Sequence, residues 1–283
     1  MDDLDGATLE DVQEWFKTYY GAANAVIAIA GDVDPLAVKA RVEHYFGDIA
    51  SGPPVLRHKA WIAKMKGVHR QTLEDRVPQA RIYKVWNVPE WGSADSDYLD
   101  LTSDVLGQGK NSRLYKHLVY EDQIATDVSA YISLRPVGGQ FRVQATAQPG
   151  VDLETIEAAV DEEIGRFLEE GPTEDEVLRV KTQYRTRFIR GLERIGGFGG
   201  KSDILASNQV YGGRPDFYKT TLERIAKAAP ADLHAAAKRW LSDGVYVLEV
   251  HPFPEFSSKT EGADRSKLPD VAEPPSLKWP DLG

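Results

Sequence analysis

Cysteine is absent from this sequence of 283 residues. Its absence excludes disulfide bonds and thiolate metal sites, but it fits a reducing compartment and an oxidising one equally well. Long apolar runs are absent too. The longest, AVIAIAG at residues 25–31, has the length of one strand, far short of the roughly 18 residues that a membrane-spanning helix needs. The sequence therefore predicts no insertion into a membrane.

Basic residues are fewer than acidic residues. Lys and Arg number 34 against 44 Asp and Glu, so the net charge at neutral pH is −10. Phosphate backbones and anionic membrane surfaces repel such a chain, and nucleic acid is not an expected partner. The opening MDDLDG lacks the cationic and apolar regions of a signal peptide. We expect either that the protein stays inside the cell or that its natural beginning precedes Met1.

The first fifty residues predict a helix, a strand and a second helix. Residues 8–20 place an apolar stripe behind Thr8, a residue type that caps helices. The stretch NAVIAIAGDV (24–33) is uncharged over its first eight residues and predicts a short buried strand. Asp34 and Pro35 then begin the next helix as cap and first residue.

Residues 67–252 predict a second, larger block. HRQTLEDRV, ARIYKVWNVP and GVYVLEVHP have the pattern of strands, and ATDVSAYISLRPVGGQFRVQATAQPG that of a hairpin turning at Gly138 and Gly139. Helices are expected over ADSDYLDLTSDVLG, NSRLYKHLVYEDQ and about 152–170, 173–194, 201–211, 215–227 and 230–241. Because the helices are grouped rather than alternating with strands, the fold class is α+β, with an antiparallel-dominated sheet backed by helices.

A weak internal repeat suggests how the chain is divided. TLEDVQEWFKTYYGAANAVIAIAGD and APADLHAAAKRWLSDGVYVLEVHPF share the order helix, glycine-containing turn, apolar strand. The second copy closes a domain, so the first is expected to close another, related domain that is incomplete here. We expect the chain to divide as follows: 1–52, the end of a first domain; 53–66, a linker; 67–252, a complete second domain; 253–283, a proline-rich connector without regular structure.

Several segments resemble the M16 (pitrilysin/insulinase-type) zinc peptidases. DLDGATLEDVQEWFKTYYGAANAVIAIAGDVDPLAVKARVEHYFGDIASGPP resembles the end of that family's first domain. GQGKNSRLYKHLVYEDQIATDVSAY and GQFRVQATAQPGVDLETIEAAVDEEIGRFLEEGPTEDEVLRVK resemble its second domain, and ADRSKLPDVAEPPSLKWPDLG resembles the connector between the halves of tandem members.

This resemblance implies a function and a set of partners. M16 peptidases are clam shells whose two halves enclose a chamber where unfolded peptides are cut. The chain would be a non-catalytic part of the chamber wall, with a peptide or unfolded protein as substrate and a second M16 half as partner. Zinc would belong to the full-length member and lie upstream, and the compartment would be a bacterial periplasm or cytoplasm. The alternative is an inactive M16-like scaffold subunit resembling the core proteins of respiratory complexes.

The stretch ARVEH spells half of a zinc motif. M16 members bind zinc with H-x-x-E-H on a helix, and here Glu43 and His44 match its end while Ala40 stands at its first histidine. At 100° per residue, Glu43 and His44 point away from the apolar face of their helix. The other histidines, at positions 58, 69, 117, 234 and 251, have no ligand spacing. We therefore expect no metal site and no cofactor in this chain.

The catalytic pair of the other half is missing as well. In the half without zinc, family members carry an Arg and a Tyr seven residues apart that reach the substrate carbonyl, in the segment matching LVYEDQIATDV. Val119 and Thr126 hold those positions here and can neither polarise a carbonyl nor stabilise an oxyanion. The resemblance is thus to the second domain of the zinc-bearing half, and no catalytic residue is expected. GGFGGK (196–201) lacks the phosphate-loop spacing and is expected to be a hinge between helices.

Overall fold

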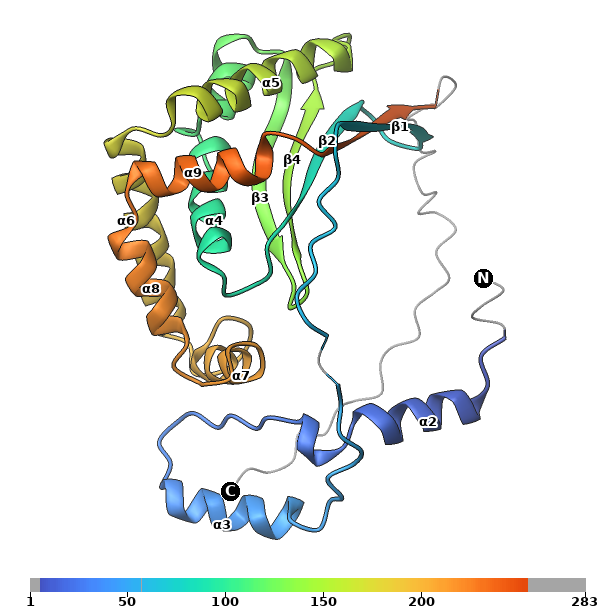
Figure 1. Ribbon diagram of the computed structural model, residues 1–283, viewed down its shortest axis with the longest axis vertical. Coiled ribbons are helices and arrows are strands. Elements are labelled where there is room, and N and C mark those ends of the chain that lie inside the picture. The colour runs from blue at the N-terminus through green and yellow to red at the C-terminus, as the bar shows by residue number, and fades with distance from the viewer. Residues whose placement is uncertain (1–5, 57, 254–283) are drawn as a thin grey trace, which may run out of the picture.

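The computed structural model describes residues 6–56 and 58–253 of the chain. Its centre is one five-stranded sheet in the order β1-β5-β2-β4-β3 (Figure 1). The strands are β1 (Val68–Asp75), β2 (Arg81–Val88), β3 (Ala125–Leu134), β4 (Gly139–Ala147) and β5 (Val245–Pro252). β1 and β5 are parallel and the other three neighbouring pairs are antiparallel, so the predicted α+β class with an antiparallel-dominated sheet is confirmed.

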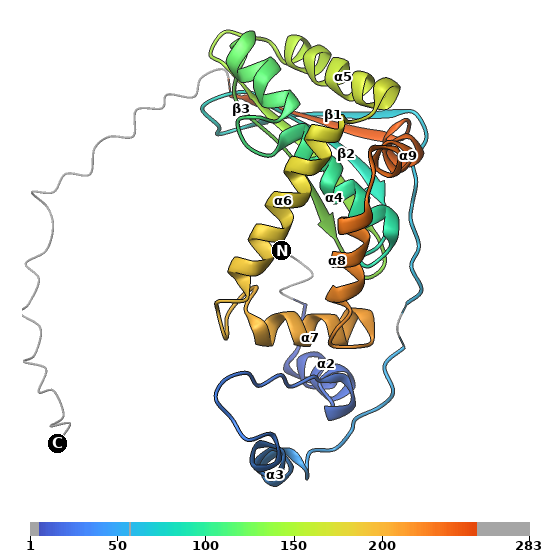
Figure 2. The same ribbon diagram turned by 90° about the vertical axis from the view of Figure 1, so that its left-hand side faces the viewer.

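The helices of this part lie on one side of the sheet, some against its strands and others against those first helices (Figure 1). They are α4 (Ala94–Gly107), η2 (Tyr115–Glu121), α5 (Leu153–Glu170), α6 (Glu174–Gly191), α7 (Lys201–Gly212), α8 (Tyr218–Lys227) and α9 (Pro230–Leu241). Figure 2 shows α6 and α8 both running from the sheet down to α7. All of these helices were predicted, but η2 is a π-helix. No helix in the described residues is long and apolar enough to cross a membrane.

The core lies between the sheet and its helices. Every second residue of β2 is buried, including Ile82, Trp86 and Val88, as expected for a strand with one covered face. Trp86 meets the fully buried Phe141 of β4 edge to face, with ring centroids 6.1 Å apart. α4 approaches β3 so closely that a Cβ on Gly107 would lie 2.0 Å from the backbone nitrogen of Ala130. Glycine is therefore required at that contact.

Two basic side chains between the sheet and its helices are paired with carboxylates. Lys84 of β2 is 3% exposed and donates to Glu157 at 3.1 Å and to Asp161 at 2.6 Å, both on α5. Arg113 makes a two-pronged pair with Glu176 of α6, at 2.8 and 2.7 Å. Such pairing is required because an unpaired charge is costly to bury. These ion pairs thus connect α5 to the sheet and α6 to the segment before η2.

One row of carboxylates on α4 is only partly paired. Asp97 accepts from Arg224 at 3.1 Å and Asp104 from Arg187 at 2.6 Å. Asp100 lies between them on the same helix face and, among the described residues, has no such partner. Burial, with added repulsion from Asp104, raises the pKa of Asp100 to about 7.

The N-terminal segment lies beyond α7, away from the sheet (Figures 1 and 2), and its Val26 and Ala28 line a hollow together with residues of α7. It contains α2 (Leu9–Tyr19), the short 3₁₀ turn η1 (Ala22–Asn24) and α3 (Pro35–Phe46). Thr8 caps α2 through a reciprocal pair of bonds with Asp11, and Asp34 caps α3 by accepting from Leu36 N at 2.8 Å. The two helices and their caps are as predicted.

The strand predicted over residues 24–33 is wrong for this structure. Residues 25–30 are extended but form no ladder, and Val26, Ile27 and Ile29 are exposed rather than buried. A strand needs a hydrogen-bonded neighbour, and no strand lies beside it in the described part of the chain. The internal repeat therefore holds in its helices, while only the second copy supplies a strand, β5.

The linker predicted over 53–66 has no helix or strand at its described positions, yet part of it is fastened to the sheet. Trp61 donates its backbone N–H to the carbonyl of Val137 at 2.9 Å, and Ala63 accepts from the side chain of Asn87 at 2.8 Å. These bonds bring the linker to the hairpin of β3 and β4. The predicted connector 253–283 lies, apart from its first residue, outside the described residues.

Candidate functional site

The side of the sheet that faces away from the helices is the strongest candidate for a functional surface. We name it the open face, and it presents the alternate, partly exposed side chains of β2, β4 and β3. Cross-strand pairing places them in rows, such as Tyr83 with Gln144 and Val85 with Arg142. The residues of these rows are Arg81, Tyr83, Val85, Asn87, Asp127, Ser129, Tyr131, Ser133, Gln140, Arg142, Gln144 and Thr146. A sheet face so rich in polar and aromatic groups suits contact with water or with another molecule.

One end of the open face is internally satisfied. Arg81 donates from Nε to Oγ1 of Thr146 at 2.8 Å and from Nη1 to the hydroxyl of Tyr83 at 3.4 Å. Thr146 in turn donates to Asp127 at 2.9 Å. The bond with Tyr83 and the nearby charge of Asp127 raise the pKa of Arg81 above its usual value. The polar side chains at this end of the open face therefore bond mainly to one another.

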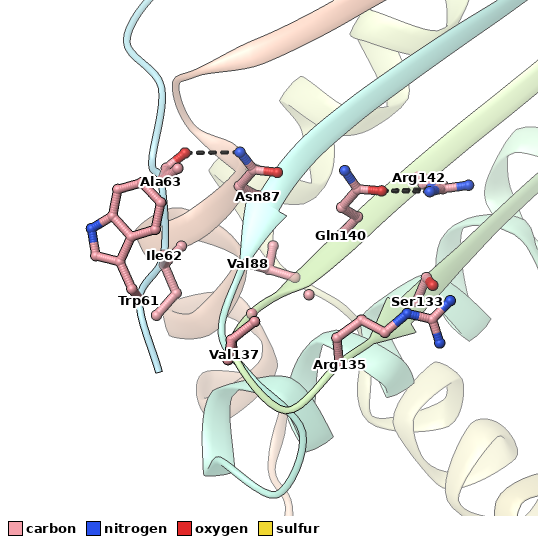
Figure 3. A pocket seen from close by; sticks show the side chains of 12 residues that line it. Trp61, Ile62, Ala63, Asn87, Val88, Ser133, Arg135, Val137, Gln140 and Arg142 are labelled. Atoms are coloured by element: carbon pink, nitrogen blue, oxygen red, sulfur yellow. Dashed lines mark hydrogen bonds between the residues drawn. The ribbon is translucent and has the colours of Figure 1, made fainter. Parts of the chain in front are cut away.

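The other end of the open face contains a hollow of about 440 Å³ (Figure 3). We name it the hairpin hollow, because the turn between β3 and β4 forms its floor. Its lining comes from the linker, the end of β2 and the hairpin: Trp61, Ile62, Ala63, Asn87, Val88, Ser133, Arg135, Val137, Gly138, Gly139, Gln140 and Arg142. Its size lies within the range of ligand pockets.

The two arginines of the hairpin hollow have no carboxylate partner in the described residues. Arg142 donates from Nε to Oε1 of Gln140 at 3.1 Å, and from Nη2 to the same oxygen. Arg135 makes no side-chain hydrogen bond or ion pair there. In Figure 3 both side chains extend along the hairpin away from Trp61. The hollow therefore has a cationic end and an aromatic end.

The half-motif ARVEH lies on the exposed surface of α3. His44 is exposed on α3 and its ring contacts that of Tyr45, with centroids 4.9 Å apart. Glu43 pairs with Lys39 at 3.7 Å on the same exposed surface. Neither side chain belongs to a group of three or more possible metal ligands in the described residues. The prediction that these residues hold no metal therefore stays a prediction for the assay described below.

The remaining histidines lie apart from one another and bind their own neighbours. Ring nitrogens of His69, His234 and His251 lie 2.9–3.2 Å from Lys66 O, Leu168 O and Glu249 respectively, and His58 is exposed. His117 on the π-helix lies between Glu163 at 2.9 Å and Asp122 at 3.2 Å. It therefore joins η2 to α5.

The segment that would carry the Arg and Tyr of the other M16 half is folded, but Val119 and Thr126 at those positions are not catalytic residue types. Val119 lies on η2 and packs against the core, and Thr126 begins the exposed part of β3, where its hydroxyl donates to Thr146 O at 3.3 Å. GGFGGK forms the connection between α6 and α7, as expected for a link between helices. Its Gly199 amide donates to Asp203 at 2.7 Å, and this carboxylate disfavours a phosphate at the loop.

Zinc does not fit the described residues. No group of three or more His, Cys, Asp or Glu side chains in 6–56 and 58–253 is arranged to hold a metal ion. A zinc site needs three or four such ligands around one point. We therefore derive no chemical step through zinc from this chain's own residues.

Comparison with known proteins identifies the family. The sequence profile of the Peptidase M16 inactive domain matches residues 6–184. The chain belongs to this family. The match begins in the N-terminal segment and ends within α6. It therefore covers both the exposed N-terminal segment and most of the packed α+β part.

The relatives of this M16 chain include named zinc proteases. It is 24% identical over 220 residues to the zinc protease PqqE of Helicobacter pylori, covering 75% of this chain and 49% of that protein. The chain thus spans about half the length of the curated relatives it matches.

Solved structures share its fold. A protease from Helicobacter pylori superposes with a TM-score of 0.79 at 21% identity, covering 89% of this chain and 61% of the other. A chain of complex III2 from Candida albicans superposes with a TM-score of 0.71 at 17% identity, covering 90% and 61%.

Sequence reasoning did not find the hairpin hollow. Its lining residues come from three separate segments, and none belongs to a motif. The available signal was alternation: Arg81, Tyr83 and Asn87 in ARIYKVWNVP, and the polar positions of QFRVQAT, already mark a strand face that is not buried. That pattern indicates an open face but not its ligand.

Proposed function

We propose that this chain forms a non-catalytic part of the wall of an M16-type zinc endopeptidase chamber, and that its open face contacts the peptide. The observation that carries the proposal is the sheet itself, which has helices on one side and polar and aromatic side chains on the other. The names of relatives such as the H. pylori zinc protease support the enzyme class. The zinc would be held elsewhere in the enzyme, by another segment or a partner half.

Photo-crosslinking tests where peptide contacts the chain. A photoreactive phenylalanine analogue is placed at Tyr131 on the open face, 37% exposed, or at Tyr120 on η2, 75% exposed. An unfolded, labelled peptide is then irradiated with each protein. We expect capture by the Tyr131 variant to exceed capture by the Tyr120 variant several-fold, although Tyr120 is the more exposed. Equal capture, or more at Tyr120, contradicts the proposal.

Metal analysis tests the non-catalytic part of the proposal. The purified, tag-free chain should lose zinc on dialysis and should not cleave a quenched peptide, because hydrolysis by this chemistry needs a metal-bound water, a base and an oxyanion stabiliser. One equivalent of zinc that survives dialysis, together with chelator-sensitive cleavage, would overturn it. His44→Ala would then show whether the ARVEH helix supplies a ligand.

The second candidate function is an M16-like scaffold subunit that takes no part in cleavage. It is favoured by Val119 and Thr126, which lack the chemistry of the Arg and Tyr pair. The likeness to a chain of complex III2 is compatible with it in fold. Adding the zinc-binding first-domain segment together with the M16 half that carries the Arg and Tyr separates the two functions: restored peptide cleavage supports the chamber wall, and a stable complex without cleavage supports the scaffold.

A further inference from the structure

We propose that the hairpin hollow binds an acidic side chain of an extended peptide, with an apolar neighbour of that residue against Trp61. This inference rests on the proposed function and narrows its substrate class. The charge of the hollow is opposite to that of the chain. The chain as a whole carries −10, yet the hollow is lined by Arg135 and Arg142 and, among its lining residues, by no Asp or Glu.

The surrounding strands supply no counter-charge at the hollow. Asp127 is the one acidic residue in the sequences of β2, β3 and β4. It lies four residues along β3 from Tyr131, the residue opposite Arg142, which is about 13 Å at the rise of an extended strand. Asp127 is also bound to Thr146 in the satisfied end of the open face. It therefore cannot neutralise the arginines of the hollow.

Glu90, the acidic residue that follows the β2 end of the hollow in the sequence, does not pair with Arg135 or Arg142 either. Glu90 follows β2, and its neighbour Trp91 donates its backbone N–H to the carbonyl of Arg135 at 3.1 Å. Neither arginine of the hollow forms an ion pair with Glu90 or any other described carboxylate, whereas Arg113 and Arg187 on the helix side both do. Arg113 and Arg187, which lie against the buried layer, are thus paired, whereas the two arginines of the hollow are available to a ligand.

The geometry favours a carboxylate beside an apolar group. A guanidinium binds a carboxylate through two parallel N–H···O bonds. Gln140 takes the Nε–H and one Nη2–H of Arg142 and so orients this guanidinium, which leaves its Nη1 edge for a carboxylate. At the other end Trp61 is 76% exposed, with Val137 also exposed and Ile62 beside it. Asn87 is occupied by its bond to Ala63 and fixes this wall. A Glu or Asp followed or preceded by an apolar residue matches both ends.

The test compares two ten-residue unstructured peptides that differ only in a central Glu or Gln next to a Leu. Binding to the full chain is followed by NMR, through the Trp61 indole N–H and the arginine Nε–H signals, at low ionic strength. We expect the Glu peptide to bind about fivefold more tightly, as for a half-exposed ion pair. Raising the salt to about 1 M should remove that preference, because exposed charges are screened.

Charge-removing variants assign the preference to the hollow. Arg135→Gln alone, at an exposed turn, and Arg135→Gln with Arg142→Gln should abolish the Glu preference, so that each variant binds the two peptides equally. The matched control is Arg185→Gln with Arg190→Gln, two exposed residues of α6 that change the net charge equally. This control should keep the full preference, and a loss there would overturn the proposal by showing a general charge effect.

The remaining outcomes separate this inference from the proposed function. Equal binding of both peptides by the unaltered chain overturns the acidic preference and leaves the peptide-contacting wall intact. No binding of either peptide overturns both. Displacement of the Glu peptide by submillimolar inorganic phosphate would assign the hollow to a free anion and also overturn the proposal.

Discussion

Phe16 in the N-terminal segment and Phe141 in the sheet are the same residue type in opposite environments. Phe141 is fully buried between sheet and helices, whereas Phe16 on α2 is 52% exposed. Most other apolar residues of the N-terminal segment are exposed too, and Ile27, Ile29, Val38 and Val42 line an open hollow of about 460 Å³ instead of closing on each other. Both regions contain apolar side chains at helical spacing, but in the described residues only the second region buries them in a core.

The difference teaches that an amphipathic helix does not make a core by itself. α2 has good caps and a clear apolar stripe, yet helices in proteins are stabilised mainly by packing of that stripe. In the second region α4 lies against β3, α9 and α6, and its glycine permits close contact. Four experiments can break or sharpen this contrast, from the largest expected effect to the smallest.

Hydrogen exchange should show the widest gap between the two regions. Amides in the centre of β4, paired on both sides, should exchange only through global unfolding, at a cost of about 5–15 kcal/mol. Amides of residues 26–29, which join no ladder in the described structure, should exchange with an opening free energy near zero. Comparable protection in both would show that the N-terminal segment is packed in solution.

Removing one aromatic ring should have very different costs in the two regions. Phe141→Ala leaves a cavity beside Trp86 and should lower the free energy of unfolding by about 3–5 kcal/mol. Phe16→Ala should change it by less than about 0.5 kcal/mol, because the ring is half exposed. Urea denaturation followed by far-UV circular dichroism measures both. A large loss for Phe16→Ala would contradict the contrast.

Asp100 should make stability depend on pH. Its folded pKa, about 7, lies above the unfolded value near 3.9, so the folded state binds the extra proton and stability falls as pH rises between those values. Asp100→Asn mimics the protonated acid and should stabilise the protein by roughly 2–4 kcal/mol at pH 8, with no gain below about pH 4.

Denaturation at both pH values measures the effect of Asp100→Asn, and Asp32→Asn in the exposed N-terminal segment is the matched control. The control removes the same charge without relieving burial, and it should be neutral at both pH values. A stabilisation of the Asp100 variant that is the same at pH 4 and pH 8 would exclude the titration of this carboxyl as its cause.

The two capping boxes provide the finest comparison. Thr8 and Thr173 each accept from the backbone N–H three residues on at 3.2 Å. Thr173→Ala should lower the free energy of global unfolding by about 1 kcal/mol, since α6 belongs to the packed layer. Thr8→Ala should reduce helicity locally in α2 and leave the global transition unchanged. A shift of the global transition by Thr8→Ala would couple the two regions.

Much of the fold could be predicted because its signals are local. The helix over 94–107 and the hairpin at Gly138 and Gly139 were found from caps, periodicity and turn residues. The strand over 24–33 failed for the opposite reason: it was inferred from apolar composition alone, which gives a preference for extended backbone but no neighbour to pair with. The candidate site was only partly accessible, since alternation marks the open face but does not bring Trp61 to Arg135.

The sequence by itself determined the family, the positions of the helices, the alternation that divides the strands into a covered and an open face, and the neutral residues Val119 and Thr126. Tertiary structure alone decided that β1 pairs in parallel with β5, that the Asp100 carboxyl is desolvated with no ion-pair partner in the described residues, and that linker, β2 and hairpin meet at one hollow. The physical reason is distance along the chain. Caps, turns and periodicity act over a few residues, whereas strand partners and pocket walls are chosen by packing between segments far apart in sequence.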